Sequence, residues 1–362
     1  MSLLTSRRPE ALHTSYAQTT SIFPTRGSRI GMLLLAVVVV VLPFVLTDFW
    51  LAVINFAAIA SIGAIGLNLL TGFTGQVSLG HAFFIGLGAY TAGYMGGNLG
   101  LPFVVWLPVA GILGGLVGLI VGPFALRLKG LYLAIVTLGL VFLGEHLFLN
   151  VRSVTGGPQG RSIPPPEVGG LSFNAIGTFS RDQSFYLLAI PMLALMTLIA
   201  KNIVRSRTGR AFQAIRDREI AASIIGVNLF RYKVAAFVIS SAYAAIGGAL
   251  LGSYLRFVGP SQFDLFLSIQ YVAMIIIGGI GTVFGAILGA FFISLVPRLV
   301  EEFSDKIPFV ATSATADGIT VFELNQIIFG ALIIVFLVAE PYGCAGLWRR
   351  AKIYFKTWPF SY

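Results

Sequence analysis

Long runs of apolar residues, repeated along most of the chain, constrain the fold more than any other feature of the sequence. A helix that crosses a lipid bilayer needs roughly 20 mostly apolar residues. About ten segments approach this requirement, near residues 30–47, 49–71, 79–97, 102–126, 130–150, 184–201, 233–256, 264–280, 281–297 and 324–339. The sequence therefore predicts an all-α, polytopic membrane protein of about ten transmembrane or broken helices.

The composition agrees with a chain that is surrounded by lipid. Charged residues make up 10% of the 362 residues, whereas a soluble domain has about 25%. The 42 glycines and 16 prolines are tolerated better in membrane helices than in soluble ones. The third, eighth and ninth segments are rich in glycine or share a boundary. Each of these three can be a broken or re-entrant element, provided that its backbone is buried or lines a cavity.

The distribution of positive charge predicts the orientation. With a cytoplasmic N-terminus, 18 of the 24 Lys and Arg residues lie in cytoplasmic segments, as the positive-inside rule requires. Both termini are then cytoplasmic and the number of spans is even. The formal net charge of +10 is explained by this orientation and does not indicate a nucleic-acid partner. The run after Ile30 is long and lacks a small-residue cleavage site, so we interpret it as a first span and not as a signal peptide.

These features predict a simple organisation. A cytoplasmic tail at 1–29 precedes a membrane domain at 30–340, and a second cytoplasmic tail follows at 341–362. The membrane domain contains a basic cytoplasmic loop at about 202–232 and two long outer loops at about 151–183 and 298–323. The first outer loop is rich in glycine and proline and is expected to be irregular.

The basic loop between the sixth and seventh spans contains a short amphipathic segment. Residues 210–225 have helical spacing, with Gly209 placed for a turn and Gly226 for a helix end. One helix face can hold Ala211, Ile215, Ala222 and Ile225, and the charged residues Arg216, Asp217, Arg218 and Glu219 project elsewhere. The residues alone leave two interpretations open. The loop is either a solvated segment whose arginines enforce topology, or a small-residue surface that another protein approaches closely.

This segment resembles the cytoplasmic docking loop of ABC importer permeases, in which Ala-Ala-x-x-x-Gly is part of the motif that the ATPase contacts. Ala221, Ala222 and Gly226 have this spacing. Two departures, Ile220 at the position of the usual glutamate and no Ile-x-Leu-Pro element after Gly226, are similar to the branched-chain amino-acid permease subfamily. The resemblance implies an ATPase-coupling surface formed by Gly209, Arg210, Ala211, Ala214, Arg216, Asp217, Glu219, Ala221, Ala222 and Gly226.

Other stretches resemble the same subfamily. The run at 66–84, which contains Gly-Phe-Thr-Gly-Gln-Val-Ser-Leu-Gly-His at 72–81, resembles a signature of the family, and the run at 277–285 resembles its late glycine-rich turn. The run at 129–138 and Thr-Gly-Gly-Pro-Gln-Gly at 155–160 resemble its M-type permease, one of two paired permeases. The resemblance implies a bacterial inner-membrane protein that works with a second permease, two ATP-binding cassette subunits and an extracytoplasmic solute-binding protein. The implied substrate is a branched-chain or related small amino acid. Similar permeases carry urea or short amides.

Several polar residues lie within or beside the apolar segments. Burying them in lipid is costly, so they are expected to face the protein interior or water. The candidates for the translocation path are Asn68, Gln76, Ser78, His81, Thr137 and Glu145. The alternative is that they form hydrogen bonds between helices or cap helix ends, and Glu145 can also reach water at the outer end of its span.

No constellation for catalysis or metal binding stands out in the sequence. The Gly278–Gly281 cluster lacks the Lys-Ser/Thr of a P-loop, so ATP hydrolysis is expected on the partner subunits, and no cofactor is expected. One cysteine and three histidines disfavour a cysteine or histidine metal site. An ion-coupled secondary transporter is the alternative from a different class. It is disfavoured because Glu145 is the only acid well inside a predicted span.

Overall fold

The computed structural model describes residues 26–125, 131–174, 176–303, 310–311, 319–340 and 343–357, which are predominantly helical. Most of the predicted N-terminal tail, the basic residues Arg127 and Lys129, much of the outer loop at 298–323 and the last residues of the C-terminal tail lie outside these ranges. The chain divides into two units. The first unit, Met1–Thr47, contains the apolar helix α2 (Arg26–Val45).

The second unit, Asp48–Tyr362, contains the other helices. In chain order these are α3 (Asp48–Thr74), α4 (His81–Ala92), α5 (Phe103–Ala125), α6 (Leu131–Asn150), α7 (Arg152–Thr155), α8 (Arg181–Arg205), α9 (Arg207–Asp217), α10 (Glu219–Ile224), α11 (Leu229–Leu255), α12 (Leu265–Gly278), α13 (Val283–Phe303), α14 (Val321–Ala339) and α15 (Gly343–Thr357). A π-helix, η1 (Gly93–Asn98), follows α4, and two 3-10 turns are η2 (Gly157–Gln159) and η3 (Pro260–Gln262).

Short strands occur only in connections between these helices, within the described residues. Strand β1 (Arg161–Ser162) pairs antiparallel with β4 (Phe257–Val258), and β2 (Glu167–Val168) pairs antiparallel with β3 (Leu171–Ser172). Strand β5 (Val310–Ala311) pairs parallel with β6 (Ile319–Thr320). The described residues of the loop at 151–183 are largely irregular, and β1 fixes this loop to the segment that follows α11.

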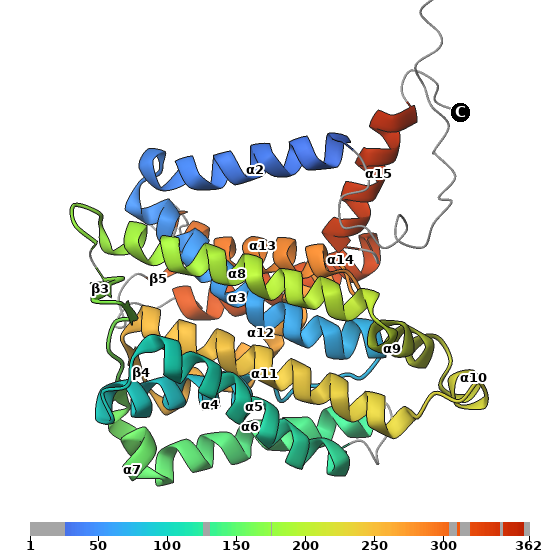
Figure 1. Ribbon diagram of the computed structural model, residues 1–362, viewed down its shortest axis with the longest axis horizontal. Coiled ribbons are helices and arrows are strands. Elements are labelled where there is room, and N and C mark those ends of the chain that lie inside the picture. Colours follow the sequence, from blue (N-terminus) through green and yellow to red (C-terminus); the bar gives the residue numbers. More distant parts are fainter. Residues whose placement is uncertain are drawn as a thin grey trace, which may run out of the picture. The chain divides into compact units, whose positions relative to one another are not determined.

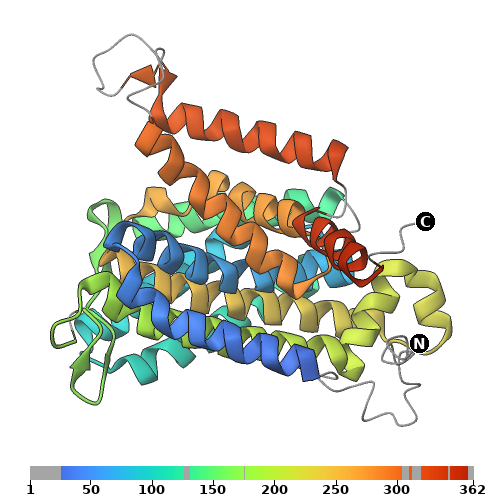
Figure 2. The same cartoon turned by 90° about the horizontal axis from the view of Figure 1, so that it is seen from above.

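The fold is that of a multi-pass helical membrane protein, which confirms the predicted class. Among the described residues, seven helices are long and apolar enough to cross a bilayer, and they are α3, α5, α6, α8, α11, α12 with its preceding turn, and α13. Shorter apolar helical stretches lie in α2 and α14, at Ala36–Val45 and Glu323–Phe336. Figure 2 shows α14 at the edge of the second unit, where it contacts α12 and α13.

Helices α3 and α11 form the centre of the second unit. Buried residues occur around most of the circumference of each, as expected for helices that other helices surround. Helix α11 packs against α3, α4 and α5, and α3 also packs against α8 and α13. Helices α9 and α10 lie at one end of these long helices, and strands β1 and β4 lie at the other (Figure 1). We call these the α9–α10 end and the β-strand end.

The third apolar segment is broken, and a single continuous span at 79–97 does not form. Residues 75–80 run without helical structure towards the middle of the second unit, where α4 begins. With 12 residues, α4 is ~18 Å long, well short of a bilayer core of about 30 Å. The Thr137 hydroxyl accepts from Leu79 N at 2.9 Å, and the Ser268 hydroxyl accepts from Ala82 N at 3.0 Å. These two hydroxyls satisfy backbone groups that a continuous helix would have paired internally.

Helices α4 and α11 approach each other through glycines. A Cβ on Gly88 would lie 1.9 Å from the carbonyl oxygen of Ala245, and a Cβ on Gly248 would lie 1.9 Å from that of Ile85. Backbone atoms within two packed helices cannot move aside as a side-chain tip can. This close contact therefore requires glycine at both positions.

Gly88→Leu is expected to push α4 away from α11 and to destabilise the purified protein. Overpacking costs about 1–3 kcal/mol, which corresponds to a melting temperature lower by about 1–4 °C in a chain of this size. The measurement is thermal unfolding in detergent, followed by fluorescence-detected size exclusion. Gly139→Ala is the control, because a Cβ there meets nothing within 4 Å. Equal melting temperatures for the two variants would contradict the close packing.

Candidate functional site

The α9–α10 segment begins with a turn at Ser206 and not at Gly209, as the sequence had suggested. The Ser206 side chain caps α9 by accepting from the amides of Thr208 and Gly209. Gly209 lies inside the helix, where a Cβ would be 2.1 Å from the carbonyl oxygen of Val204. This glycine therefore allows α9 to fold back closely on the end of α8.

The predicted single helix over residues 210–225 is divided in two. Arg218 has an extended backbone, with φ −157° and ψ 104°, and separates α9 from α10. Lys233 Nζ of α11 lies 2.5 Å from Glu219 Oε1 at the start of α10. This pair holds α10 against α11, so Glu219 faces the membrane domain. The helical spacing of the sequence could not show this break, because it depends on a lysine 14 residues away.

Gly226 ends α10, as the sequence predicted. Its φ of +88° is in the left-handed region. The Gly226 amide donates to the carbonyl of Ser223, and the Val227 amide donates to that of Ala222, both at distances of 3.0–3.1 Å. This pair of bonds is the Schellman arrangement, in which glycine is favoured because a side chain strains the left-handed conformation.

Three exposed isoleucines form the most prominent surface of α10. Ile220, Ile224 and Ile225 are 78%, 80% and 74% exposed, and we call them the isoleucine patch. The prediction that Ile225 shares one helix face with Ala211, Ile215 and Ala222 is wrong, because Ile225 is exposed whereas the other three are buried. Apolar side chains clustered in a polar loop mark an interaction surface. The sequence signal for this patch is the Ile-x-x-x-Ile-Ile spacing of residues 220–225.

The predicted coupling residues divide between the surface and the interior of this segment. Arg210, Arg216, Asp217, Ala221 and Gly226 are exposed, Ala214 and Glu219 are half-buried, and Gly209, Ala211 and Ala222 are buried. Beneath them, Phe212 and Ile215 are buried completely or nearly so, and α9 contacts α3, α8 and α11. The segment is therefore a surface that is packed firmly onto the membrane helices.

Arg216 joins α9 to two other parts of the second unit. Its Nη1 donates to the carbonyl oxygen of Gly72, near the end of α3, at 3.0 Å. A Cβ placed on Gly281, in the turn between α12 and α13, would lie 2.7 Å from the same nitrogen. The Asn68 side chain of α3 completes the contact. It accepts from Gly281 N at 2.9 Å and donates to the carbonyl oxygen of Thr282 at 2.8 Å. We call this set of contacts the Arg216 junction.

The other candidates for the translocation path lie beside the broken segment. The Gln76 side chain donates to the hydroxyl of Thr74 at 2.8 Å, and Ser78 accepts from Gly80 N at 3.3 Å. His81 Nε2 is 3.0 Å from the carbonyl oxygen of Gly63. Thr137 holds Leu79, and Glu145 is half-buried on α6. Asn68 and Thr137 form hydrogen bonds between distant elements, and Ser78 forms a local bond just before α4, as the alternative expects. A path role for any of the six stays a prediction.

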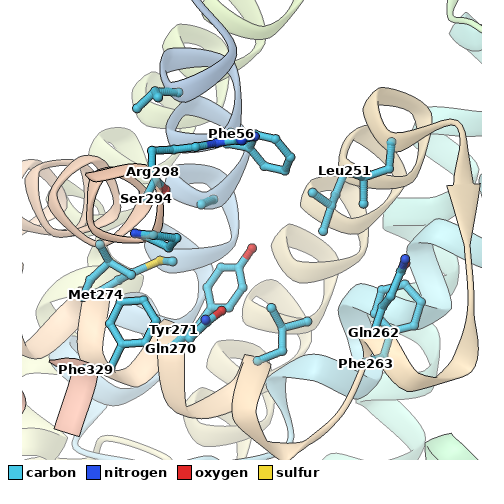
Figure 3. Close-up of a pocket in the computed structure, with 16 residues that line it drawn as sticks. Phe56, Leu251, Gln262, Phe263, Gln270, Tyr271, Met274, Ser294, Arg298 and Phe329 are labelled. Atoms are coloured by element: carbon cyan, nitrogen blue, oxygen red, sulfur yellow. The ribbon is translucent and has the colours of Figure 1, made fainter. Parts of the chain in front are cut away.

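A cavity of about 390 Å³ lies towards the β-strand end, between α3, α11, α12, α13 and α14. Figure 3 shows the lining side chains, among them Phe56, Leu251, Phe263, Tyr271 and Arg298. The guanidinium of Arg298 lies 5.7 Å from the centre of the Phe56 ring, so it reaches from α13 to α3. None of the predicted path residues lines this cavity, although the His81 ring lies 5.0 Å from that of Tyr271. The signal for Arg298 was an arginine within an apolar helix, which was assigned only to the outer loop.

Among the described residues, no group of three or more His, Cys, Asp or Glu side chains is arranged to hold a metal ion. Within the same residues, the features that can carry function are the isoleucine patch, the Arg216 junction and the cavity.

Comparison with known families gives one match that covers most of the chain. The family described as "Branched-chain amino acid transport system / permease component" matches residues 49–337. This range contains α3 to α13 and most of α14, and with them the isoleucine patch, the Arg216 junction and the cavity. No solved structure matches the chain.

Individual relatives are also permeases. The chain is 31% identical over 343 residues to the high-affinity branched-chain amino acid transport system permease protein LivM of Escherichia coli K12, covering 90% of this chain and 76% of the relative. It is 24% identical to LivH of Salmonella typhimurium, covering 78% and 90%. It is 29% identical to the autoinducer 2 import system permease protein LsrC of an Enterobacter species, covering 63% and 64%.

Proposed function

Because the chain belongs to the branched-chain amino acid transport system permease family, we propose that it is the M-type permease subunit of an ABC importer. It forms half of the translocation pathway for branched-chain or related amino acids, in the inner membrane of a bacterium. The other half is a second permease, similar to LivH. The similarity of this chain to both LivM and LivH supports such a pair.

Two ATP-binding cassette subunits drive the transport, and a solute-binding protein delivers the amino acid. The ATPases bind the α9–α10 end, and the distribution of Lys and Arg in the sequence supports a cytoplasmic position for this end and for both termini. The solute-binding protein then meets the opposite face, where the irregular loop at 151–183 lies. The permease itself hydrolyses no ATP.

The observation that carries this proposal is the construction of the α9–α10 segment. It presents exposed apolar side chains at the isoleucine patch, which suits contact with another protein. It is also bonded to α3 and packed against the α12–α13 turn at the Arg216 junction. A partner that binds the patch can therefore displace α9, the end of α3 and the α12–α13 turn together.

Two alternatives lead to different expectations. A permease for urea or short amides would have the same coupling segment and would differ only in the substrate that it carries. An ion-coupled secondary transporter would need no ATPase and would be expected to use carboxylates within its membrane helices. Glu145 lies on α6 and does not line the cavity, which favours the ABC importer.

Gly226→Trp is expected to abolish co-purification of the ATPase subunits while the protein still inserts into the membrane. Tryptophan strains the left-handed conformation that ends α10 and adds a large side chain beside the isoleucine patch. The control is Gly226→Asn, because asparagine tolerates this backbone conformation and is smaller. The measurement is affinity purification of the whole transporter followed by quantification of each subunit. Normal ATPase recovery with the tryptophan variant would contradict the docking role.

A further inference from the structure

We propose that helix α15 (Gly343–Thr357) lies in the surface of the bilayer and binds the headgroups of anionic phospholipids. Its apolar side enters the boundary between headgroups and acyl chains, and its basic side meets the lipid phosphates. The bilayer surface concerned is the one at the α9–α10 end. This inference goes beyond the proposed function, because it needs neither ATP nor a partner subunit.

Helix α15 has two sides of opposite character. Leu347, Ala351 and Tyr354 follow one another at helical spacings of four and three residues, and all three side chains are exposed. Three basic residues recur at spacings of three and four along the opposite side, namely Arg349, Lys352 and Lys356. The sequence of the helix contains no Asp or Glu. A basic amphipathic helix of this kind is typical of segments that lie in the plane of a membrane interface.

The direction of α15 agrees with this position. Figure 1 shows α15 at the α9–α10 end, where it runs across the direction of the long helices α3 and α11. A helix that lies across the ends of membrane spans runs roughly parallel to the bilayer surface. Trp348 is 60% exposed, and its ring lies 6.4 Å from that of Phe284 near the start of α13. Tryptophan is enriched at the level of the lipid headgroups, so this contact places α15 at the same level.

Helix α14 brings α15 to the lipid. Ile334, Val335 and Val338 are exposed near the end of α14, as is suitable for side chains that face acyl chains. Glu340 follows α14 and accepts from Arg350 of α15 at 2.9 and 2.6 Å. This ion pair engages Arg350 and fixes α15 beside the end of α14, so the proposal depends on the other basic residues. A cluster of Lys and Arg directly after a lipid-facing helix is typical of binding to anionic headgroups.

The first turn of α15 connects it to the α12–α13 turn. A Cβ on Gly343 would lie 2.5 Å from the carbonyl oxygen of Ile277 and 2.7 Å from the amide nitrogen of Gly279. The same turn is held in the Arg216 junction. Lipid bound to α15 therefore holds an element that also contacts α9. Figure 1 shows α15 extending away from α9 and α10, so a protein on the isoleucine patch need not cover it.

Fluorescence of the full-length chain in lipid nanodiscs tests the position of α15. The background is Cys344→Ser, because Cys344 is the lone cysteine. A fluorescent NBD label is attached at Ala351→Cys on the apolar side or, as the matched control, at Ile353→Cys, which lies away from that side and keeps every basic residue. The readout is quenching by a phospholipid that carries a nitroxide near its headgroup. With phosphatidylglycerol in the nanodisc we expect strong quenching at 351 and weak quenching at 353. High salt or phosphatidylcholine alone should reduce the quenching at 351.

Removal of positive charge tests the contact with anionic headgroups. Lys352→Gln together with Lys356→Gln should lower the ratio of lipid-bound to free α15 about 25-fold, because each basic residue near an anionic surface contributes about fivefold. Arginine at both positions keeps the charge and should keep the quenching at 351. Equal quenching at 351 and 353, equal quenching with and without phosphatidylglycerol, or unchanged quenching in the glutamine variant would overturn the proposal. Protection of residue 351 from the lipid quencher when ATPase subunits are added would also overturn it, because α15 would then bind the ATPase.

Discussion

Replacing Ile220, Ile224 and Ile225 together with aspartate is expected to release the ATPase subunits from the permease. All three side chains are more than 70% exposed, so the change leaves the interior of the membrane domain intact. Burying an isoleucine at an interface contributes up to about 1.5–3 kcal/mol. Even half of the combined contribution corresponds to a dissociation constant that is about 100-fold higher. The measurement is ATPase binding to the purified permease pair, and uptake should fall in parallel.

The matched control is replacement of the same three residues with leucine. This variant keeps an apolar surface of similar size and is expected to retain most of the ATPase. Insertion and folding of both variants are compared by size-exclusion profile and thermal unfolding. If the aspartate variant binds the ATPase as tightly as the unmodified protein, the isoleucine patch is not the docking surface.

Arg216→Ala is expected to separate ATP hydrolysis from transport. Arg216 lies on α9, where it bonds to the end of α3 and contacts the α12–α13 turn. Without it, a movement of α9 is transmitted less effectively to the helices around the cavity. Coupling free energies of about 1–3 kcal/mol are typical between linked sites, so uptake per ATP hydrolysed should fall about tenfold or more. The ATPase subunits should stay bound and active.

Two comparisons distinguish this role from a general loss of stability. Arg216→Lys keeps the charge but offers one ammonium group in place of the planar guanidinium, so it should restore only part of the coupling. Arg207→Ala removes an arginine from the first position of α9, which lies outside the Arg216 junction, and should leave the coupling near normal. An unchanged ratio of uptake to hydrolysis in Arg216→Ala would contradict the transmission role.

The sequence predicted the membrane helices well because their signal is local. Each span is a continuous apolar run, and α3, α5, α8 and α11 lie close to the expected bounds. The break at residues 75–80 and the start of α4 could not be predicted in the same way. They depend on hydroxyls of Thr137 and Ser268, which come from distant helices. The glycines of this segment indicated a break but not its position.

The candidate site was predicted in outline and differed in its details. The loop that contains α9 and α10 was identified from its charge, its small residues and Gly226. The orientation of α10 could not be predicted from this segment, because α10 is held by an ion pair between Glu219 and Lys233 of α11. The cavity was missed for a similar reason. Its lining side chains come from five helices, and no spacing along one segment brings Phe56 and Arg298 together.

Uptake of leucine into proteoliposomes tests the central claim most directly. The vesicles contain this chain, its partner permease and the ATPase subunits, with the solute-binding protein added to the face opposite the ATPases. We expect leucine accumulation with ATP and none with ADP or with an ATPase variant that binds ATP but does not hydrolyse it. Leucine accumulation driven by a proton or sodium gradient in vesicles without ATPase subunits and without ATP would contradict this claim.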